Sequence, residues 1–164
     1  MMPGRPVVAN HTPLVAFWTI RKMGILRELF NEILIPPAVY DEFLAFEQEG
    51  RLALLSDNPW IKVTPLENPV RVQIFAGLDR GEAEVLALAE EQNAQLILMD
   101  ERRGRRYAQR LGLPLSGTLG VLLLEKEVGL NETVLPMVSA MQEIGLHFHS
   151  DLIAKALDLA GETV

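Results

Sequence analysis

Oxygen-bearing side chains stand where two strand-like segments of the sequence end and a helix begins. One short apolar run leads into Asn10, and a second leads into Asp100. Open α/β sheets place ligand sites at the carboxyl ends of their strands, so we expect these two side chains to meet at one edge. Two further acids, Glu42 and Glu82, lie in helix-like segments. Four oxygen donors converging there would suit one hard divalent cation, and the set predicts phosphodiester cleavage.

The elements that must position these residues follow from alternating strand-like and helix-like segments, with no internal repeat. Such alternation favours an α/β class with helices on both faces of a parallel sheet. We expect a three-layer α/β/α fold with a mainly parallel central sheet of about five strands. The predicted strands cover residues 6–10, 32–35, 60–63, 95–99 and 113–116.

Helices are predicted between and after these strands from periodicity and from capping residues. They cover residues 12–23, 25–30, 81–91, 101–111, 119–126 and 150–160, with one opening at Pro36-Pro37 that carries Glu42 and another marked by Val134, Val138, Met141 and Ile144. Expected N-caps are Thr12, Asp79 and Thr118, while Gly24 and Gly161 are expected to end helices. The last helix carries an apolar stripe, Ile153, Ala156, Leu157 and Ala160, that should dock on the domain or on a second copy.

Composition sets the class of protein. With 164 residues, 49% of them hydrophobic, we expect residues 1–164 to form a single domain. The absence of cysteine excludes disulfides, thiolate metal sites and a cysteine nucleophile, and it fits a reducing, cytoplasmic compartment. Apolar runs fall far short of the roughly 20 residues that a membrane helix needs, so we expect a soluble protein with no membrane contact.

The charge distribution is uneven. A net charge of -7 argues against a generally basic nucleic-acid binder, because such binding depends on neutralising phosphates. Five of the fifteen basic residues nevertheless fall within nine positions directly after Asp100; they are Arg102, Arg103, Arg105, Arg106 and Arg110. This run has two interpretations that the sequence leaves open, a solvated helix face or a phosphate track beside the acids.

Each candidate residue also has a purely structural interpretation. Glu42 could be an exposed helix acid, Glu82 could complement a helix N-terminus, and Asp100 could cap the following helix. His11 could act as a general base, although we prefer a surface or capping role.

Other kinds of site find less support in the sequence. His147 and His149 alternate in a strand-like patch and could bind adventitious metal. No Ser/His/Asp nucleophile set and no phosphate-cradling glycine loop are evident, so covalent hydrolase and nucleotide-binding functions are disfavoured.

Taken in order, five stretches resemble the PIN-domain superfamily of metal-dependent ribonucleases, particularly PIN-like proteins related to the toxins of toxin-antitoxin pairs. They are residues 7–14, 33–42, 77–84, 96–105 and 116–122. The resemblance implies an α/β/α fold, Mg²⁺ or Mn²⁺ in an acidic pocket and hydrolysis of RNA by metal-activated water. It also implies an antitoxin partner and a homodimer, which are frequent among such proteins.

The resemblance assigns roles to residues by their match to the family's pattern. Its acidic positions fall on Glu42, Glu82 and Asp100, but Asn10 stands where the family has an aspartate. The implied catalytic and metal-binding set is therefore Asn10, Glu42, Glu82 and Asp100, with Thr12 and Thr118 in support and with Arg102, Arg103, Arg105 and Arg106 near the RNA.

Asn10 offers an oxygen without a charge. At an effective dielectric near 20, a unit charge at about 4 Å interacts with another by about 4 kcal/mol before desolvation offsets much of this. We therefore expect weakened metal binding. Two functions stay open, a metal-dependent ribonuclease and an inactive PIN-like module that binds RNA or an antitoxin. A receiver-like signalling domain ranks lowest, because the expected lysine pattern is missing.

Overall fold

Five parallel strands form one sheet in the order β3-β2-β1-β4-β5. The strands of this computed structural model, which describes residues 4–46 and 48–162, are β1 (Val7–Ala9), β2 (Ile33–Ile35), β3 (Ile61–Val63), β4 (Leu96–Leu98) and β5 (Leu115–Ser116). Val8 lies opposite Leu34 on one side and Ile97 on the other, and all three are buried. Continuous apolar runs are expected of parallel strands that are covered on both faces. The α/β/α prediction is confirmed.

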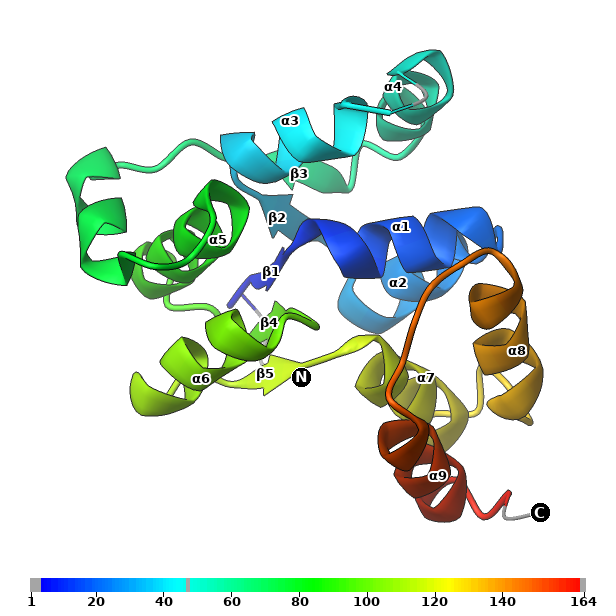
Figure 1. Cartoon of the computed structure of the whole chain (residues 1–164). Coiled ribbons are helices and arrows are strands. Elements are labelled where there is room, and N and C mark those ends of the chain that lie inside the picture. Colours follow the sequence, from blue (N-terminus) through cyan, green and yellow to red (C-terminus); the bar gives the residue numbers. More distant parts are fainter. Residues whose placement is uncertain (1–3, 47, 163–164) are drawn as a thin grey trace.

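Helices cover both faces of the sheet. Right-handed crossovers put the helices between β1, β2 and β3 on one face and those between β3, β4 and β5 on the other. The first group comprises α1 (His11–Thr19), α2 (Met23–Phe30), α3 (Pro37–Leu44) and α4 (Gln48–Asp57); the second comprises α5 (Arg80–Glu91) and α6 (Arg102–Arg110), preceded by the 3-10 helix η1 (Pro69–Phe75). Figure 1 shows α5 and α6 across the sheet from α1 and α2.

Three further helices follow the sheet, α7 (Thr118–Glu127), α8 (Leu135–Glu143) and α9 (Ser150–Leu159). Three of the four residues in the apolar stripe of α9 pack within the chain, which is one of the two dockings that were predicted: Ala156 is buried, and Ile153 and Ala160 pack against the core. Among the described residues, no helix is both long and apolar enough to cross a membrane.

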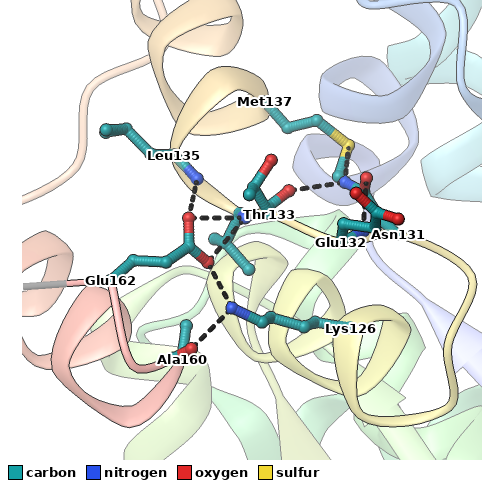
Figure 2. A network of polar contacts seen from close by, with 9 residues as sticks. Lys126, Asn131, Glu132, Thr133, Leu135, Met137, Ala160 and Glu162 are labelled. Carbon is teal, nitrogen blue, oxygen red and sulfur yellow. Dashed lines mark hydrogen bonds and ion pairs between the residues drawn. The ribbon is translucent and has the colours of Figure 1, made fainter.

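A polar clasp, defined as Glu162 and its partners, joins α7, α8 and α9 (Figure 2). The Glu162 carboxylate accepts hydrogen bonds from the backbone N–H of Val134 at 2.8 Å and of Leu135 at 3.1 Å. It also pairs with Lys126 Nζ at 2.9 Å, and that ammonium donates to the Ala160 carbonyl at 2.6 Å. The clasp thus satisfies N–H groups at the start of α8 and ties both neighbouring helices to it.

The predicted helix over residues 12–23 is wrong in its extent. Asn10 occupies the N-cap position of α1, so the helix begins at His11, and it ends at Thr19. Arg21 has a φ of 59°, a left-handed conformation that a continuing helix does not allow. Gly24 therefore does not end a helix but lies inside α2. The prediction also missed α4 and η1, whose sequences lack a clear helical period.

Two of the predictions for helix ends hold, whereas the three at Thr12, Gly24 and Thr118 are wrong. Asp79 caps α5, and Gly161, with a φ of 73°, follows the last residue of α9 in the left-handed conformation that favours glycine. Gly117, not Thr118, is the N-cap residue of α7. The expected strand at His147 and His149 is also wrong, because His149 instead accepts the Asp151 N–H at 3.2 Å and caps α9.

Candidate active site

The ends of β1 and β4 meet where the strand order reverses. Ala9 pairs with Leu98, and the Asn10 N–H donates to the Leu98 carbonyl at 2.9 Å. Asp100 follows two residues later on the β4 side. The structure therefore brings Asn10 and Asp100 to the same edge of the sheet, at the switch point where open α/β folds bind ligands.

Asn10 lies at this edge as a buried amide without a partner for its oxygen. The residue is only 4% exposed, and its Oδ1 has no hydrogen-bond partner among the described residues. It holds the N-cap position of α1, but its side chain makes no capping bond. A buried acceptor left unpaired costs free energy, and such groups are rare in proteins. This oxygen is therefore available to a ligand.

Asp100 is fixed by the start of α7. Its carboxylate accepts the Thr118 N–H at 2.8 Å and the Thr118 hydroxyl at 2.6 Å. Thr118 is fully buried, so this pairing orients the acid. A Cβ on Gly117 would lie 2.7 Å from Asp100 Oδ1 and 3.2 Å from Arg105 Nη1. Only a glycine therefore leaves room for the acid in this position.

Glu82 lies on the first turn of α5, paired with Asp79 in a capping box. Asp79 Oδ1 accepts the Glu82 N–H at 2.8 Å, and Glu82 Oε2 accepts the Asp79 N–H at 3.3 Å. Burial, followed by the charge of Asp79, raises the pKa of Glu82 above its ordinary value, while Arg103 acts in the opposite direction. The structural role that the sequence allowed is thus present, and the acid still belongs to an electrostatic cluster.

Glu42 reaches this cluster from α3. Its carboxylate lies against Gly81, where a Cβ would clash with it. Burial and the charges of Asp79 and Glu82 raise the pKa of Glu42. Like charges that each raise a neighbour's pKa are typical of acids gathered for function. Glu42, Asp79 and Glu82 form what we call the acidic cluster.

The candidate site therefore has two parts, the acidic cluster and the fixed Asp100. Its donors are all oxygens, which suits Mg²⁺ or Mn²⁺, and the unpaired Asn10 oxygen adds a neutral donor. Within the described ranges, however, no group of three or more histidine or acidic side chains is placed to hold a metal ion. The chemistry of the donors fits such an ion, whereas the spacing of the carboxylates does not form a closed ligand set.

His11 and Thr12 occupy the first turn of α1, and both are half-buried. His11 neither caps the helix nor lies free on the surface as expected, since its Nε2 is buried and has no partner among the described residues. Burial and then the charge of Arg51 lower the pKa of His11, although Asp79 opposes this. Burial and Arg51 thereby favour the neutral ring beside the acidic cluster. Thr12 stays an expected supporting residue.

The arginine run divides into distinct environments. Arg105 Nη1 donates to the Met99 carbonyl at 3.0 Å, beside Asp100. Arg103 and Arg106, with Arg110, line a groove on α6, whereas Arg102 is exposed and outside that groove. The five arginines therefore do not share one surface, because consecutive helical residues point in different directions.

Sequence reasoning missed several residues that shape the site. Asp79 was predicted only as a cap, yet its charge acts on both neighbouring glutamates. Glu84 accepts the Ala38 N–H at 3.1 Å and so anchors the start of α3, which carries Glu42. Gly81 and Gly117 provide space for the two carboxylates. A glycine directly before Glu82 and another before Thr118 were the available signals.

Comparison with known families matches nearly the whole chain. Residues 6–162 match the model of the family DUF3368, a PIN domain. No curated protein matches the sequence significantly. The match agrees with the five-stranded parallel sheet that helices cover on both faces. This chain belongs to a PIN-domain family.

Proposed function

We propose that this PIN domain is a metal-dependent ribonuclease that hydrolyses RNA phosphodiester bonds. Its catalytic and metal-binding residues in this proposal are Asn10, Glu42, Glu82 and Asp100. The observation that carries the proposal is the buried, unpaired Asn10 oxygen at the switch point of the sheet. An unpaired buried acceptor costs free energy, and at a ligand-binding edge of the sheet a bound cation would offset that cost. The family match supports a nuclease as the class of protein.

The residues of the site have separable tasks. Thr118 holds Asp100 with both its N–H and its hydroxyl, so that this acid presents a fixed carboxylate. The negative charges of Glu42 and Glu82 repel each other and the charge of Asp79. This repulsion favours binding of a cation. A divalent ion held by these oxygens would lower the pKa of the attacking water and offset charge on the phosphate.

Weak metal binding is part of this proposal. Asn10 supplies no charge where the family has an aspartate, and the carboxylates must move closer to share one ion. Both features lower affinity without removing the donors. Activity should therefore be low and should rise when the missing charge is restored.

A second candidate function is an inactive PIN module that binds RNA or an antitoxin. Asn10, together with the engagement of both Asp100 oxygens by Thr118, favours it. Membership of a toxin-antitoxin pair, an antitoxin partner and a homodimer rest on the resemblance to toxin-related PIN proteins and are proposals of the same kind.

The test compares wild type, Asn10→Asp and Asp100→Asn by Mn²⁺ calorimetry and by cleavage of a mixed RNA pool. We expect Asn10→Asp to bind Mn²⁺ about tenfold more tightly or better, since even a screened unit charge contributes more than 1 kcal/mol at short range. Cleavage should rise in parallel, and Asp100→Asn should lose both properties. Unchanged Mn²⁺ affinity in Asp100→Asn would place the site elsewhere. Mn²⁺ binding without RNA cleavage, in both wild type and Asn10→Asp, would favour the inactive module.

A further inference from the structure

A groove on α6 concentrates positive charge on an acidic protein. It encloses about 270 Å³ and is lined by Gly77, Arg103, Arg106, Tyr107 and Arg110. The chain carries a net charge of -7. Within the part of the chain that the structure describes, none of these three arginines forms an ion pair with an acid. Their charges are therefore available to an anionic partner.

Neutral contacts hold the groove in shape. Tyr107 donates its hydroxyl to the Ala76 carbonyl at 3.1 Å, and its ring packs edge-on against Phe75 with centroids 6.0 Å apart. The Arg110 guanidinium lies 5.8 Å from the centre of the Tyr107 ring. Arg103 Nη1 donates to the Gly77 carbonyl at 3.1 Å. These contacts order two of the arginines without neutralising them, which reduces the entropy lost on binding.

The groove adjoins the acidic cluster. Gly77, on its wall, lies two residues before Asp79, the cap of α5. Helices α5 and α6 contact one another on the same face of the sheet (Figure 1). Arg103 lines the groove, and its charge is close enough to Glu82 to act against the raised pKa of that acid. A ligand in the groove therefore lies beside the candidate active site.

We propose that this groove binds the phosphodiester backbone of single-stranded RNA and leads it to the acidic cluster. Arg103, Arg106 and Arg110 lie along one face of α6 at spacings of three and four residues. From first to last they span about 10 Å, which accommodates about three phosphates of a stacked strand at about 3.4 Å each. A single strand suits so short a track, because a duplex would press further phosphates against an acidic surface.

This inference rests on the proposed function for its choice of RNA, but it does not need catalysis. It also excludes part of the arginine run. Arg105 is committed to the Met99 carbonyl beside Asp100, and Arg102 lies outside the groove. Backbone recognition is accordingly assigned to three residues, one of which, Arg110, lies outside the set that the family resemblance suggests.

The experiment measures binding of a fluorescein-labelled 12-nucleotide oligouridine to the full chain by anisotropy, in EDTA, over a range of salt. The groove variant carries Arg106→Gln and Arg110→Gln. A matched control carries Arg27→Gln and Lys155→Gln, two exposed cationic residues whose removal changes net charge equally. We expect the groove variant to lose about tenfold in affinity at low salt and about 1.4 units of log-log salt slope, or about 0.7 per phosphate contact. The control should lose less than about twofold.

Three results would overturn the groove. They are equal losses in the two variants, no binding by wild type in EDTA, and displacement of the RNA by inorganic phosphate at equal phosphate concentration, which would indicate a free-anion site. Mn²⁺ calorimetry on the groove variant keeps the two proposals separate, because its affinity should match wild type. Groove-specific binding without any cleavage of RNA would support the groove while contradicting the proposed hydrolysis.

Discussion

The Glu162 carboxylate of the polar clasp and the carboxylates of the acidic cluster lie in opposite electrostatic environments. Glu162 receives two backbone N–H groups and the Lys126 ammonium (Figure 2). Desolvation opposes ionisation there, but these donors hold the pKa of Glu162 below its ordinary value. Glu42 and Glu82 instead face burial and other acids, and both pKa values are raised.

Glu162 is therefore a carboxylate that stabilises the folded protein, whereas the carboxylates of the acidic cluster destabilise it. Hydrogen bonds to a charged group stabilise a protein, whereas clustered acids without a cation destabilise it. Clustered acids are retained where a ligand supplies positive charge, and such clusters are typical of functional sites. Asp100 lies between these extremes, because Thr118 orients it at the edge where the Asn10 Oδ1 has no partner among the described residues.

The largest expected effect breaks the fixed position of Asp100. In Gly117→Ala the new Cβ would lie 2.7 Å from Asp100 Oδ1, so the carboxylate must move away from Thr118. We expect Mn²⁺ affinity in Asn10→Asp, the tighter-binding background, to fall at least about tenfold on adding Gly117→Ala, since one such displacement removes a charged ligand.

Gly24→Ala in the same background is the matched control for that change. A Cβ on Gly24 meets no atom within 4 Å, and the residue lies in α2 away from the site. Its Mn²⁺ affinity should be unchanged, and stability should rise by up to about 1 kcal/mol because alanine favours helix. Equal Mn²⁺ affinities for the two alanine variants would show that the position of Asp100 is unimportant.

The layout of the sheet was predictable because apolar strand runs and helix periodicity follow directly from burial. The capping box at Asp79 was predictable as well, since it depends on residues three positions apart. The break near Arg21 was not, because a left-handed arginine has no sequence signature. Contacts between distant segments were also out of reach, including the seating of Glu42 on Gly81.

Electrostatic environments were the least predictable feature. Glu125 reads as an ordinary acid near the end of an apolar helix, yet it is fully buried and neither carboxylate oxygen has a partner among the described residues. The five arginines likewise look equivalent in sequence and differ in space. The burial and the partners of a charged side chain depend on its position along the helix together with the neighbouring elements.

A smaller effect sharpens the role of the clasp. Glu162→Gln removes the charge that pairs with Lys126 and weakens the bonds to the start of α8. We expect the free energy of unfolding to fall by about 1 kcal/mol, comparable to loss of a helix cap, with Mn²⁺ affinity unchanged. Urea titration at constant m-value measures it. Glu127→Gln, at an exposed residue at the end of α7, is the control. An identical urea midpoint for the two variants would show that the polar clasp does not stabilise the fold.

The smallest effect concerns Glu42 and has the opposite sign. Because folding raises the pKa of Glu42 above 4.5, the folded state holds the proton more tightly than the unfolded chain does. Glu42 therefore costs stability at neutral pH, and this cost disappears as pH falls through the folded pKa towards 4.5. In EDTA at pH 7, Glu42→Gln should raise the free energy of unfolding by a few tenths to about 1 kcal/mol.

The pH profiles of the two glutamate variants should consequently diverge. Glu162 has a lowered pKa, so its contribution is present above 4.5 and is lost as pH falls through its folded value. Thermal unfolding from pH 7 to pH 4 should show the Glu42→Gln advantage shrinking towards pH 4.5, while the Glu162→Gln deficit persists to lower pH. Asp41→Asn, beside Glu42 and exposed, should change stability by less than about 0.5 kcal/mol. A Glu42→Gln variant less stable than wild type at pH 7 without metal would mean that the acidic cluster stabilises the fold as the clasp does.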